Sequence, residues 1–540
     1  MKNMISSRVR DAAPWLGAAA TGLLLFAAFP PLEWKDLSWI AFVPLLLVAR
    51  RAKARQAFRL GLVSGAVFWL SSIAWLTRVT VVGWLTLSLY CALFVAPAAV
   101  LFSAWTRRRG TGSGAANVAL MVLLTAVWAG FEYLRSTLFT GFAWNPLGAT
   151  QARNVVLLRL AQWGGVYAVS ALVMWVNAAL ALTLLRYAEG RAGWARRAHP
   201  EVMLAFLALV AATVFGARDL RRDQVPTSPL RVTVIQPNIP QDEKWTPEKY
   251  EMIYSRLRTL TEQALRAGTP ALVVWPETAV PDDIRSSEQS YGLVYEMATN
   301  GAPILVGSMD TEWIEDAPPR YYNSSFLFDG EGLLAQVYDK RHLVLFGEYV
   351  PLQPFLPFVK ALTPIQESFS PGRTSTVFRL EASGAAFSAL ICFEDTVAPL
   401  AAESVRNGAR LLINQTNDAW FDPGWASRQH MIQSILRCVE NGVPAVRSAN
   451  TGVSCFIDRY GRVTDILDDG HGVVRIAGWR AAEVQLPPDD MPLTFYTRHG
   501  DLFAQACAGI GFLALFFACR RRPDATNKGP KNGNAEQKLA

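Results

Sequence analysis

Long apolar stretches are the feature of this sequence that most restricts how the chain can fold. They fill most of the first 218 residues and return once near the carboxyl end. Stretches of this length match the hydrocarbon core of a bilayer, in which helices satisfy their own backbone polar groups. We therefore expect an integral membrane protein with roughly eight membrane-spanning helices. The stretches run approximately over residues 15–29, 37–48, 60–76, 81–105, 116–134, 155–185, 202–215 and 502–519.

The first two stretches are short, and Pro30-Pro31 separates them. They can form either two spans or a re-entrant pair of half-spans. A cleaved signal peptide is disfavoured, because further apolar stretches follow and no small-residue cleavage site precedes Phe29.

Basic residues alternate between the loops that join the stretches. Clusters precede the first stretch and follow the second, fourth, sixth and last, whereas the loops between them are sparse in positive charge. Because basic loops are retained on the cytoplasmic side during insertion, we expect both termini to be cytoplasmic. The clusters lie within residues 2–10, 50–59, 107–109, 186–197 and 520–522.

This pattern divides the chain into four parts. We expect a seven-span transmembrane domain over residues 1–218, a large extracytoplasmic domain over 219–499, a last transmembrane helix over 500–522 and a polar cytoplasmic tail over 523–540. Within the second part, short β-rich runs alternate with amphipathic helical patterns, which is typical of an α/β domain with its own core. The runs cover residues 230–236, 271–275, 304–308, 323–328, 387–392, 411–414 and 452–457, the clearest helices 249–267 and 425–441, and the hairpin turns 329–332 and 458–462.

Several binding functions are disfavoured by composition. The net charge of +8 comes from short basic clusters beside apolar spans, so we expect no nucleic-acid partner. The six cysteines contain no CxxC pair and the five histidines have no ligand-like spacing, so we expect no metal site, disulfide framework or cofactor. Cys438 and Cys455 are interpreted as structural residues.

Three β-rich runs end in reactive side chains. Glu277 follows one run, Lys340 follows another, and Cys392 ends a third. Each residue taken alone could be a cap, a solvated charge or a core thiol. Together they supply a base, a cation and a nucleophile for acyl transfer through a thioester, in which the cation and the backbone N–H after the nucleophile stabilise the oxyanion.

The sequence around these residues resembles the nitrilase (carbon-nitrogen hydrolase) superfamily, and the chain as a whole resembles the apolipoprotein N-acyltransferase family. The resemblance covers nearly the full length. The Glu, Lys and Cys motifs carry the superfamily likeness, and the flanking spans with the Phe-Gly-Glu stretch carry the acyltransferase likeness. The matching stretches are IQPNIPQ (235–241), KW (244–245), WPET (275–278), YDKRHLV (338–344), FGEYVP (346–351), ICFE (391–394) and NQTNDAWF (414–421).

The resemblance implies an α-β-β-α sandwich with Glu277, Lys340 and Cys392 as the catalytic triad. It implies that Glu348 holds Lys340 and that Glu394 supports the nucleophile. Two positions depart from the family pattern. Phe393 stands where the family often has Tyr, and Leu345 replaces a frequent Pro. We assign Phe393 a supporting role without hydroxyl chemistry.

The resemblance also implies a reaction and a location. Cys392 would take an acyl chain from a membrane phospholipid and pass it to a diacylated lipoprotein, in the inner membrane of a bacterium with the catalytic domain in the periplasm. Trp245 and Trp420 are the candidate substrate-binding residues, and each can alternatively be a packing aromatic. A membrane-tethered amidohydrolase with the same triad is the alternative enzyme, and a non-catalytic transporter is disfavoured.

Aromatic segments beside the motifs are candidate lipid contacts. One is the apolar segment from Pro351 to Pro371, and another contains Phe421 and Trp425 beside Trp420. Their alternative is packing inside the domain. A third group, Phe139, Phe142 and Trp144, lies in a loop expected on the outer side and is interpreted as interfacial anchors.

Overall fold

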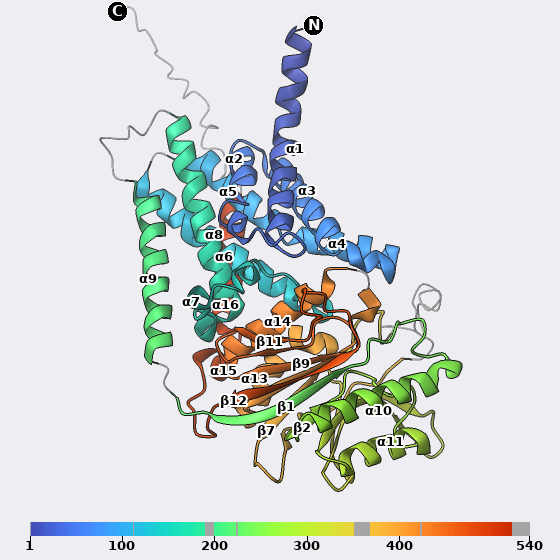
Figure 1. Ribbon diagram of the computed structural model, residues 1–540. Helices are drawn as coiled ribbons and strands as arrows, with labels where there is room; N and C mark the ends of the chain where they lie inside the picture. The colour runs from blue at the N-terminus through green and yellow to red at the C-terminus, as the bar shows by residue number, and fades with distance from the viewer. Residues whose placement is uncertain are drawn as a thin grey trace, which may run out of the picture.

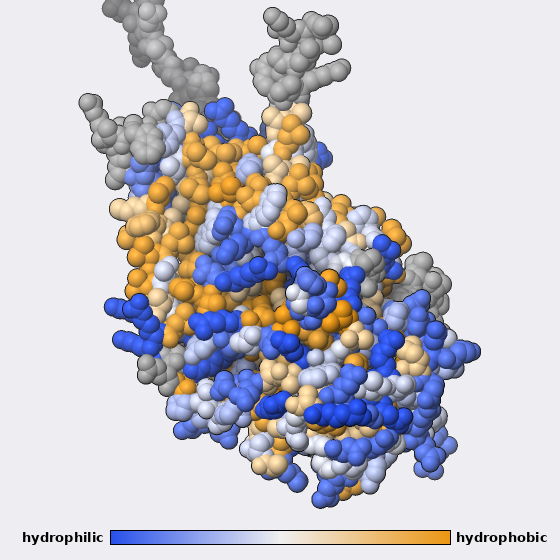
Figure 2. All heavy atoms as spheres, viewed as in Figure 1, coloured by the Kyte–Doolittle hydropathy of each residue, from blue (hydrophilic) through white to orange (hydrophobic). Residues whose placement is uncertain are grey.

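The computed structural model describes residues 2–111, 113–189, 199–222, 225–349, 368–421 and 424–520. It shows a bundle of helices at one end of the molecule and an α/β domain at the other (Figure 1). Hydrophobic side chains gather over the helical part, whereas the visible face of the α/β domain is mostly hydrophilic (Figure 2). The two parts expected from the sequence are therefore distinct in space.

Six helices among the described residues are long and apolar enough to cross a membrane, and they cover residues 11–28, 81–109, 114–140, 161–188, 200–222 and 502–519. The span over 81–109 consists of two helices, and the one over 161–188 is kinked at Gly164 and Gly165. The helices of this part are α1 (Lys2–Ala28), α2 (Val43–Ala49), α3 (Ala54–Ser72), α4 (Val81–Leu93), α5 (Ala96–Arg109), α6 (Gly114–Thr137), α7 (Val155–Leu158), α8 (Ala161–Ala188), α9 (Pro200–Arg222) and α16 (Leu502–Cys519).

The apolar run over residues 37–48 does not form a membrane-length helix, which corrects the expectation of a span there. It forms the 3-10 turn η1 (Lys35–Trp39) and the seven-residue α2, whose rise of about 10 Å is too short to cross a bilayer. A side chain of α8 makes hydrogen bonds to backbone groups of this segment. Asn177 accepts a hydrogen bond from the Phe42 N–H at 2.8 Å and donates one to the Ser38 carbonyl oxygen at 2.9 Å.

Polar contacts join several helix ends on the side away from the α/β domain (Figure 1). Arg108, at the end of α5, donates to the carbonyl oxygens of Phe517 and Arg520 at 3.0 and 2.8 Å. Arg186 of α8 pairs with Glu201 of α9 at 2.9 Å. The basic ends of these helices therefore lie together, as the alternation of charge in the sequence requires.

The α/β domain consists of two six-stranded sheets. The first has the order β12-β1-β2-β3-β4-β5 and the second the order β11-β10-β9-β8-β7-β6. Both expected hairpins are present, since β4 pairs with β5 and β10 with β11 in antiparallel fashion. The strands are β1 (Ser228–Gln236), β2 (Leu272–Val274), β3 (Ile304–Glu312), β4 (Arg320–Phe328), β5 (Leu334–Asp339), β6 (Phe378–Arg379), β7 (Ala386–Ile391), β8 (Leu411–Thr416), β9 (Ala445–Ala449), β10 (Cys455–Ile457), β11 (Val463–Ile466) and β12 (Gly478–Leu486).

The two sheets pack face to face, because alternate strand residues point to opposite sides. Val232 and Val234 of β1 share a core with Ile413 of β8, between the sheets. Val273 points the other way, into a core covered by α10 (Tyr250–Arg266) and α11 (Glu288–Thr299). With α13 (Ala398–Arg406) and α14 (Ala426–Asn441) on the second sheet, the expected α-β-β-α sandwich is confirmed.

The outer helices of the second sheet pack directly on the helical part. Ile435 and Leu436 of α14 belong to the same buried cluster as residues of α3, α6 and α8. Polar contacts reinforce this junction, because Trp425 donates to the Ser72 carbonyl oxygen at 2.9 Å and the Val166 N–H donates to Glu440 at 2.9 Å. The α/β domain is therefore held on the membrane part by a continuous core.

Candidate active site

The three reactive residues expected from the sequence come together between the sheets. Glu277 follows β2 and Lys340 follows β5 in the first sheet, whereas Cys392 follows β7 in the second. The Nζ atom of Lys340 lies 3.4 Å from Oε1 of Glu277. Burial raises the pKa of the Cys392 thiol most; the charge of Glu277 raises this pKa further and that of Lys340 lowers it, so the thiol lies within electrostatic reach of both. All three side chains are buried.

Lys340 is held by two carboxylates. Its Nζ contacts Oε1 of Glu348 at 2.7 Å as well as Glu277. Although burial lowers the pKa of Lys340, the charges of Glu348 and Glu277 raise it above its usual value overall. Glu348 is itself fixed, because its Oε2 accepts a hydrogen bond from the Val344 N–H at 2.9 Å. The structure thus places a permanent cation beside the thiol.

Glu277 has one oxygen engaged and one available. Its Oε1 accepts a hydrogen bond from Asn323 Nδ2 at 2.8 Å in addition to the contact with Lys340. Its Oε2 is buried and has no hydrogen-bond partner among the described residues. A carboxylate oxygen left open in this way can accept a proton from a neighbouring thiol or amine.

Cys392 stands at a strained turn between strand and helix. Its φ is +52°, a left-handed conformation that is uncommon for residues other than glycine, and it begins the short 3-10 helix η6 (Cys392–Thr396). Thr278, which follows Glu277, also has a positive φ, at +43°. Such strain persists only where the surrounding structure enforces it. Burial, followed by the charge of Glu277, raises the pKa of the Cys392 thiol, so the resting group is neutral.

Glu394 joins the strand that carries the lysine to the strand that carries the thiol. Its carboxylate accepts hydrogen bonds from the Arg341 N–H at 2.7 Å and the His342 N–H at 3.0 Å, just after Lys340. It also accepts bonds from the Ile391 N–H at 2.8 Å and from the Tyr338 hydroxyl at 2.9 Å. This single buried side chain therefore fixes the spacing between β5 and β7.

Phe393 is the centre of an aromatic stack that reaches into the membrane part. Its ring lies parallel to those of Trp144 and Phe142, at 6.2 Å between centroids in each case. Trp144 and Phe142 are both buried, which corrects their interpretation as interfacial anchors. Phe139 is the exposed member of that group, at 81%. The ring of His342 stacks on Phe393 as well, at 6.1 Å between centroids.

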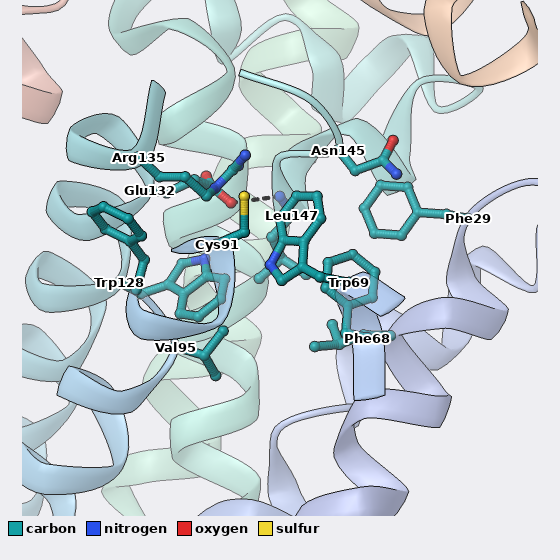
Figure 3. Close-up of a pocket in the computed structure, with 12 residues that line it drawn as sticks. Phe29, Phe68, Trp69, Cys91, Val95, Trp128, Glu132, Arg135, Asn145 and Leu147 are labelled. Carbon is teal, nitrogen blue, oxygen red and sulfur yellow. Dashed lines mark hydrogen bonds between the residues drawn. The ribbon is translucent and has the colours of Figure 1, made fainter. Parts of the chain in front are cut away.

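Glu132, Arg135, Asn145 and Leu147 line a pocket beside the loop that carries Trp144 (Figure 3). The pocket lies within the helical part and is lined mainly by aromatic and aliphatic side chains, with Glu132 and Arg135 among them. Glu132 accepts a hydrogen bond from the Leu147 N–H at 2.6 Å. Arg135 donates to the Trp144 carbonyl oxygen at 2.8 Å. The two charges on α6 thus hold the loop that contacts Phe393.

The two candidate substrate-binding tryptophans are both 40% exposed. Trp245 lies in the loop between β1 and α10, and Trp420 lies in the short helix η7 (Asp418–Phe421). The aromatic neighbours of Trp420 contact the helical part of the molecule. Phe421 packs on Trp75 at 4.5 Å, and Trp425 bonds to the backbone of α3, so both are contacts between the two parts of the molecule. The other proposed lipid-contacting segment, residues 351–371, lies for the most part outside the described residues.

Sequence reasoning missed a second lysine at the site. Lys244 is only 2% exposed and donates a hydrogen bond to the Glu277 carbonyl oxygen at 3.1 Å. Burial lowers the pKa of Lys244 to about 8, against the opposing charges of Glu277 and Cys392. The sequence did offer one indication of this role, because Lys244 stands beside Trp245 in the stretch KW (244–245) that resembles the family. Among the described residues, no group of His, Cys, Asp and Glu side chains is arranged to hold a metal ion.

Comparisons with known proteins agree with this architecture. Residues 21–179 match the family described as apolipoprotein N-acyltransferase N-terminal domain, and residues 231–485 match carbon-nitrogen hydrolase. Among solved structures, Nit3 of Saccharomyces cerevisiae, a member of the nitrilase superfamily, is 19% identical and covers 48% of this chain and 90% of its own. Its TM-score of 0.35 is too low to add to the assignment.

Two relatives match this chain over nearly its whole length, and both have the same name. The apolipoprotein N-acyltransferase of Geobacter metallireducens is 36% identical over 95% of this chain and 97% of its own length. The protein of the same name from Gloeobacter violaceus is 31% identical over 98% of both chains. The chain belongs to the apolipoprotein N-acyltransferase family.

Proposed function

We propose that this protein transfers a fatty acyl chain from a membrane phospholipid to the α-amino group of the diacylglyceryl-cysteine of a lipoprotein, by way of a thioester on Cys392. The observation that carries the proposal is the arrangement of Glu277, Lys340 and Cys392. A neutral thiol lies with a carboxylate whose Oε2 is open and a lysine held as a cation. These are the parts that acyl transfer through a cysteine requires.

In the first step, the Cys392 Sγ attacks the ester carbonyl of the phospholipid while Glu277 takes the thiol proton. The ammonium of Lys340 stabilises the oxyanion of the tetrahedral intermediate, a contribution of about 3–4 kcal/mol when one such donor is removed from other enzymes. The intermediate then expels the alkoxide of a lysophospholipid. Glu277 returns its proton to this alkoxide, which leaves an acyl thioester on Cys392.

In the second step, the lipoprotein amine attacks the thioester carbonyl. Glu277 removes the proton that the amine loses as the new amide bond forms. The Cys392 thiolate leaves and recovers a proton from Glu277. The same base and the same oxyanion site therefore serve both halves of the reaction, and no cofactor is needed for the balance of atoms.

The position of the sandwich on the membrane part supports lipid-linked substrates. Acyl chains leave a bilayer only at a cost of about 0.8 kcal/mol for each buried methylene group. A catalytic domain packed on the helices through α14 can act on chains that stay in the membrane. Trp245 and Trp420 are proposed to contact these substrates.

We also propose the topology that the charge pattern predicts. Residues 1–218 would form the membrane domain, 219–499 the catalytic domain in the periplasm, 500–522 the last transmembrane helix and 523–540 a cytoplasmic tail, in the inner membrane of a bacterium. The contacts among Arg108, Phe517 and Arg520 support a common side for the basic helix ends. Helix α9 continues to Arg222, so the first boundary falls within its last turns.

Mass spectrometry of Cys392 tests the reaction. The purified protein is incubated with phospholipid alone and compared with Cys392→Ala and with Cys438→Ala, which changes a buried thiol away from the site. We expect one acyl mass on the Cys392 peptide, absent only in Cys392→Ala and discharged by a diacylated lipopeptide. Discharge by water alone would support the amidohydrolase alternative, and the absence of any adduct would contradict the proposal.

A further inference from the structure

Four buried charged side chains form a compact cluster directly behind Cys392, and the mechanism above does not use them. They are two carboxylates and two cations, and none of their side chains is more than 1% exposed. Their charges balance when both bases are protonated. The cluster consists of Asp395 in η6, Asp418 in η7, His430 in α14 and Arg447 in β9.

His430 lies at the centre of this cluster with both ring nitrogens facing acceptors. Nδ1 lies 2.8 Å from Oδ1 of Asp418, and Nε2 lies 2.9 Å from Oδ1 of Asp395. Because a carboxylate oxygen can only accept, both nitrogens must carry a proton. Burial and Arg447 lower the pKa of His430, but the two aspartates raise it to about 9 overall. Arg447 faces the same aspartates, at 2.8 Å from Asp395 and 3.5 Å from Asp418.

The cluster reaches the nucleophile through its backbone. The Cys392 carbonyl oxygen accepts a hydrogen bond from Nδ2 of Asn414 at 3.0 Å, and at 3.2 Å it shares the one Nε2 proton of His430 with Asp395. Asn414 belongs to β8 of the second sheet and His430 to α14, whereas Glu277 and Lys340 follow strands of the first sheet. Because the peptide group is planar and trans, the N–H of the next residue points in the opposite direction. The Phe393 N–H therefore points away from His430 and Asn414.

We infer that His430 is a positioning residue of the proposed acyl transfer, which, together with Asn414, locks the Cys392 carbonyl so that the Phe393 N–H serves as an oxyanion donor. This inference rests on the proposed function and deepens it. His430 does not touch the substrate. It acts by holding one peptide group in the orientation that the strained φ of Cys392 would otherwise oppose.

A residue of the membrane part, Trp144, also contacts His430 and its neighbour in α14. The ring of Trp144 lies over that of His430 at 5.3 Å between centroids. Its Nε1 donates to Oε1 of Gln429, the preceding residue, at 2.7 Å. Orientation of the oxyanion donor therefore depends on a tryptophan from the helical part as well as on the sandwich.

The test separates two reactions of the same thiol. Acylation passes through an oxyanion, whereas alkylation by chloroacetamide does not, so only acylation needs the Phe393 N–H. Both rates at Cys392 are measured by mass spectrometry in the full-length protein, with phospholipid micelles and separately with a para-nitrophenyl ester as acyl donor. His430→Gln removes the charge and replaces two donor nitrogens by a single amide nitrogen. His471→Gln changes an exposed histidine and is the matched control.

For His430→Gln, we expect acylation by either donor to slow about 10- to 100-fold, with alkylation within about twofold of the parent. In the parent, the ratio of acylation to alkylation should fall as the pH rises through about 9, where His430 loses its second proton. That fall should be absent in His430→Gln and kept in His471→Gln. The pH dependence of the acylation-to-alkylation ratio in the parent tests the inference even if His430→Gln does not fold. His430→Asn is a second variant in which both rates can be measured.

Equal losses of acylation and alkylation, or no loss of either, would overturn the inference. The two donors keep its failure distinct from that of the proposed function. If the para-nitrophenyl ester acylates Cys392 of the parent but phospholipid does not, the proposed acyl donor is wrong. The effect of His430→Gln on acylation by the activated ester still tests the positioning role. If both donors acylate the parent and His430→Gln equally, the proposed function stands and the positioning role does not.

Discussion

The indole of Trp144 stacks on the ring of Phe393 with an angle of 3° between their planes and 6.2 Å between centroids. One residue belongs to a loop of the membrane part, and the other follows the candidate nucleophile. The same indole contacts His430 and Gln429. The geometry around Cys392 is therefore built jointly by the two parts of the molecule.

Replacement of Trp144 tests this joint construction. Trp144→Leu should slow acylation of Cys392 about tenfold and lower the apparent Tm, because truncation of a buried tryptophan typically costs about 3–5 kcal/mol. Acylation is measured well below the Tm of both proteins. Trp313→Leu, at a site 78% exposed, is the control and should change neither quantity. A loss of stability with an unchanged acylation rate would restrict Trp144 to a structural role.

The two carboxylates beside Lys340 should differ in their effect on the rate. Glu277→Gln removes the base and should slow thioester formation about 10²- to 10⁴-fold. Glu348→Gln removes a charge that raises the pKa of Lys340 and should slow it by about tenfold. Single-turnover acylation measures both, with the exposed Glu315→Gln as control. Equal rates for the two variants would contradict the separate roles.

Gly307 of β3 packs closely against the backbone of the turn at Glu277. A Cβ at Gly307 would lie 2.8 Å from the Glu277 Cα and would also clash with the Pro276 carbonyl oxygen. Gly307→Ala should therefore displace Glu277 and reduce acylation, with an overpacking cost of about 1–3 kcal/mol. In Gly292→Ala the new methyl group meets open space, so the acylation rate should not change. Parent-like acylation by Gly307→Ala would show that the turn can move without loss.

Glu394 should matter for stability as well as for rate. In Glu394→Gln, the amide group faces backbone donors such as the Ile391 N–H, and a buried donor left unpaired costs about 1–3 kcal/mol. We expect a lower apparent Tm and slower acylation, since the strands that carry Lys340 and Cys392 lose their link. Thermal unfolding in detergent measures the first effect, with the exposed Glu381→Gln as control. An unchanged Tm would contradict the linking role.

The buried charge cluster should make stability depend on pH. The pKa of His430 is raised from 6.5 to about 9 in the folded protein. Its stabilising contribution is therefore complete below pH 6.5 and is lost as the pH rises through about 9. The apparent Tm of the parent should fall between pH 7 and pH 9 more steeply than that of His430→Gln, whereas His471→Gln should follow the parent. Parallel curves for parent and His430→Gln would contradict the assignment.

Local sequence patterns predicted many of the elements and placed the three candidate reactive residues at strand ends. The β-rich runs that precede Glu277 and Cys392 form β2 and β7, and the turn at 329–332 joins β4 to β5. These features depend on the alternation and length of apolar residues within a few positions of the chain. The same patterns left residues 37–48 open between a full span and half of a re-entrant pair, and the chain forms a 3-10 turn and a short helix there.

The sequence by itself determined the two environments of this chain, the α/β class of its catalytic domain and the three residues proposed to react, because each depends on residues that are neighbours along the chain. Tertiary structure alone decided that Trp144 packs on Phe393, that Glu132 and Arg135 hold the Trp144 loop, and that His430 bonds to the Cys392 carbonyl. A buried polar group must find a partner wherever the fold brings one. Some of these partners lie far away in sequence, as with Trp144 and Gln429, which are 285 residues apart.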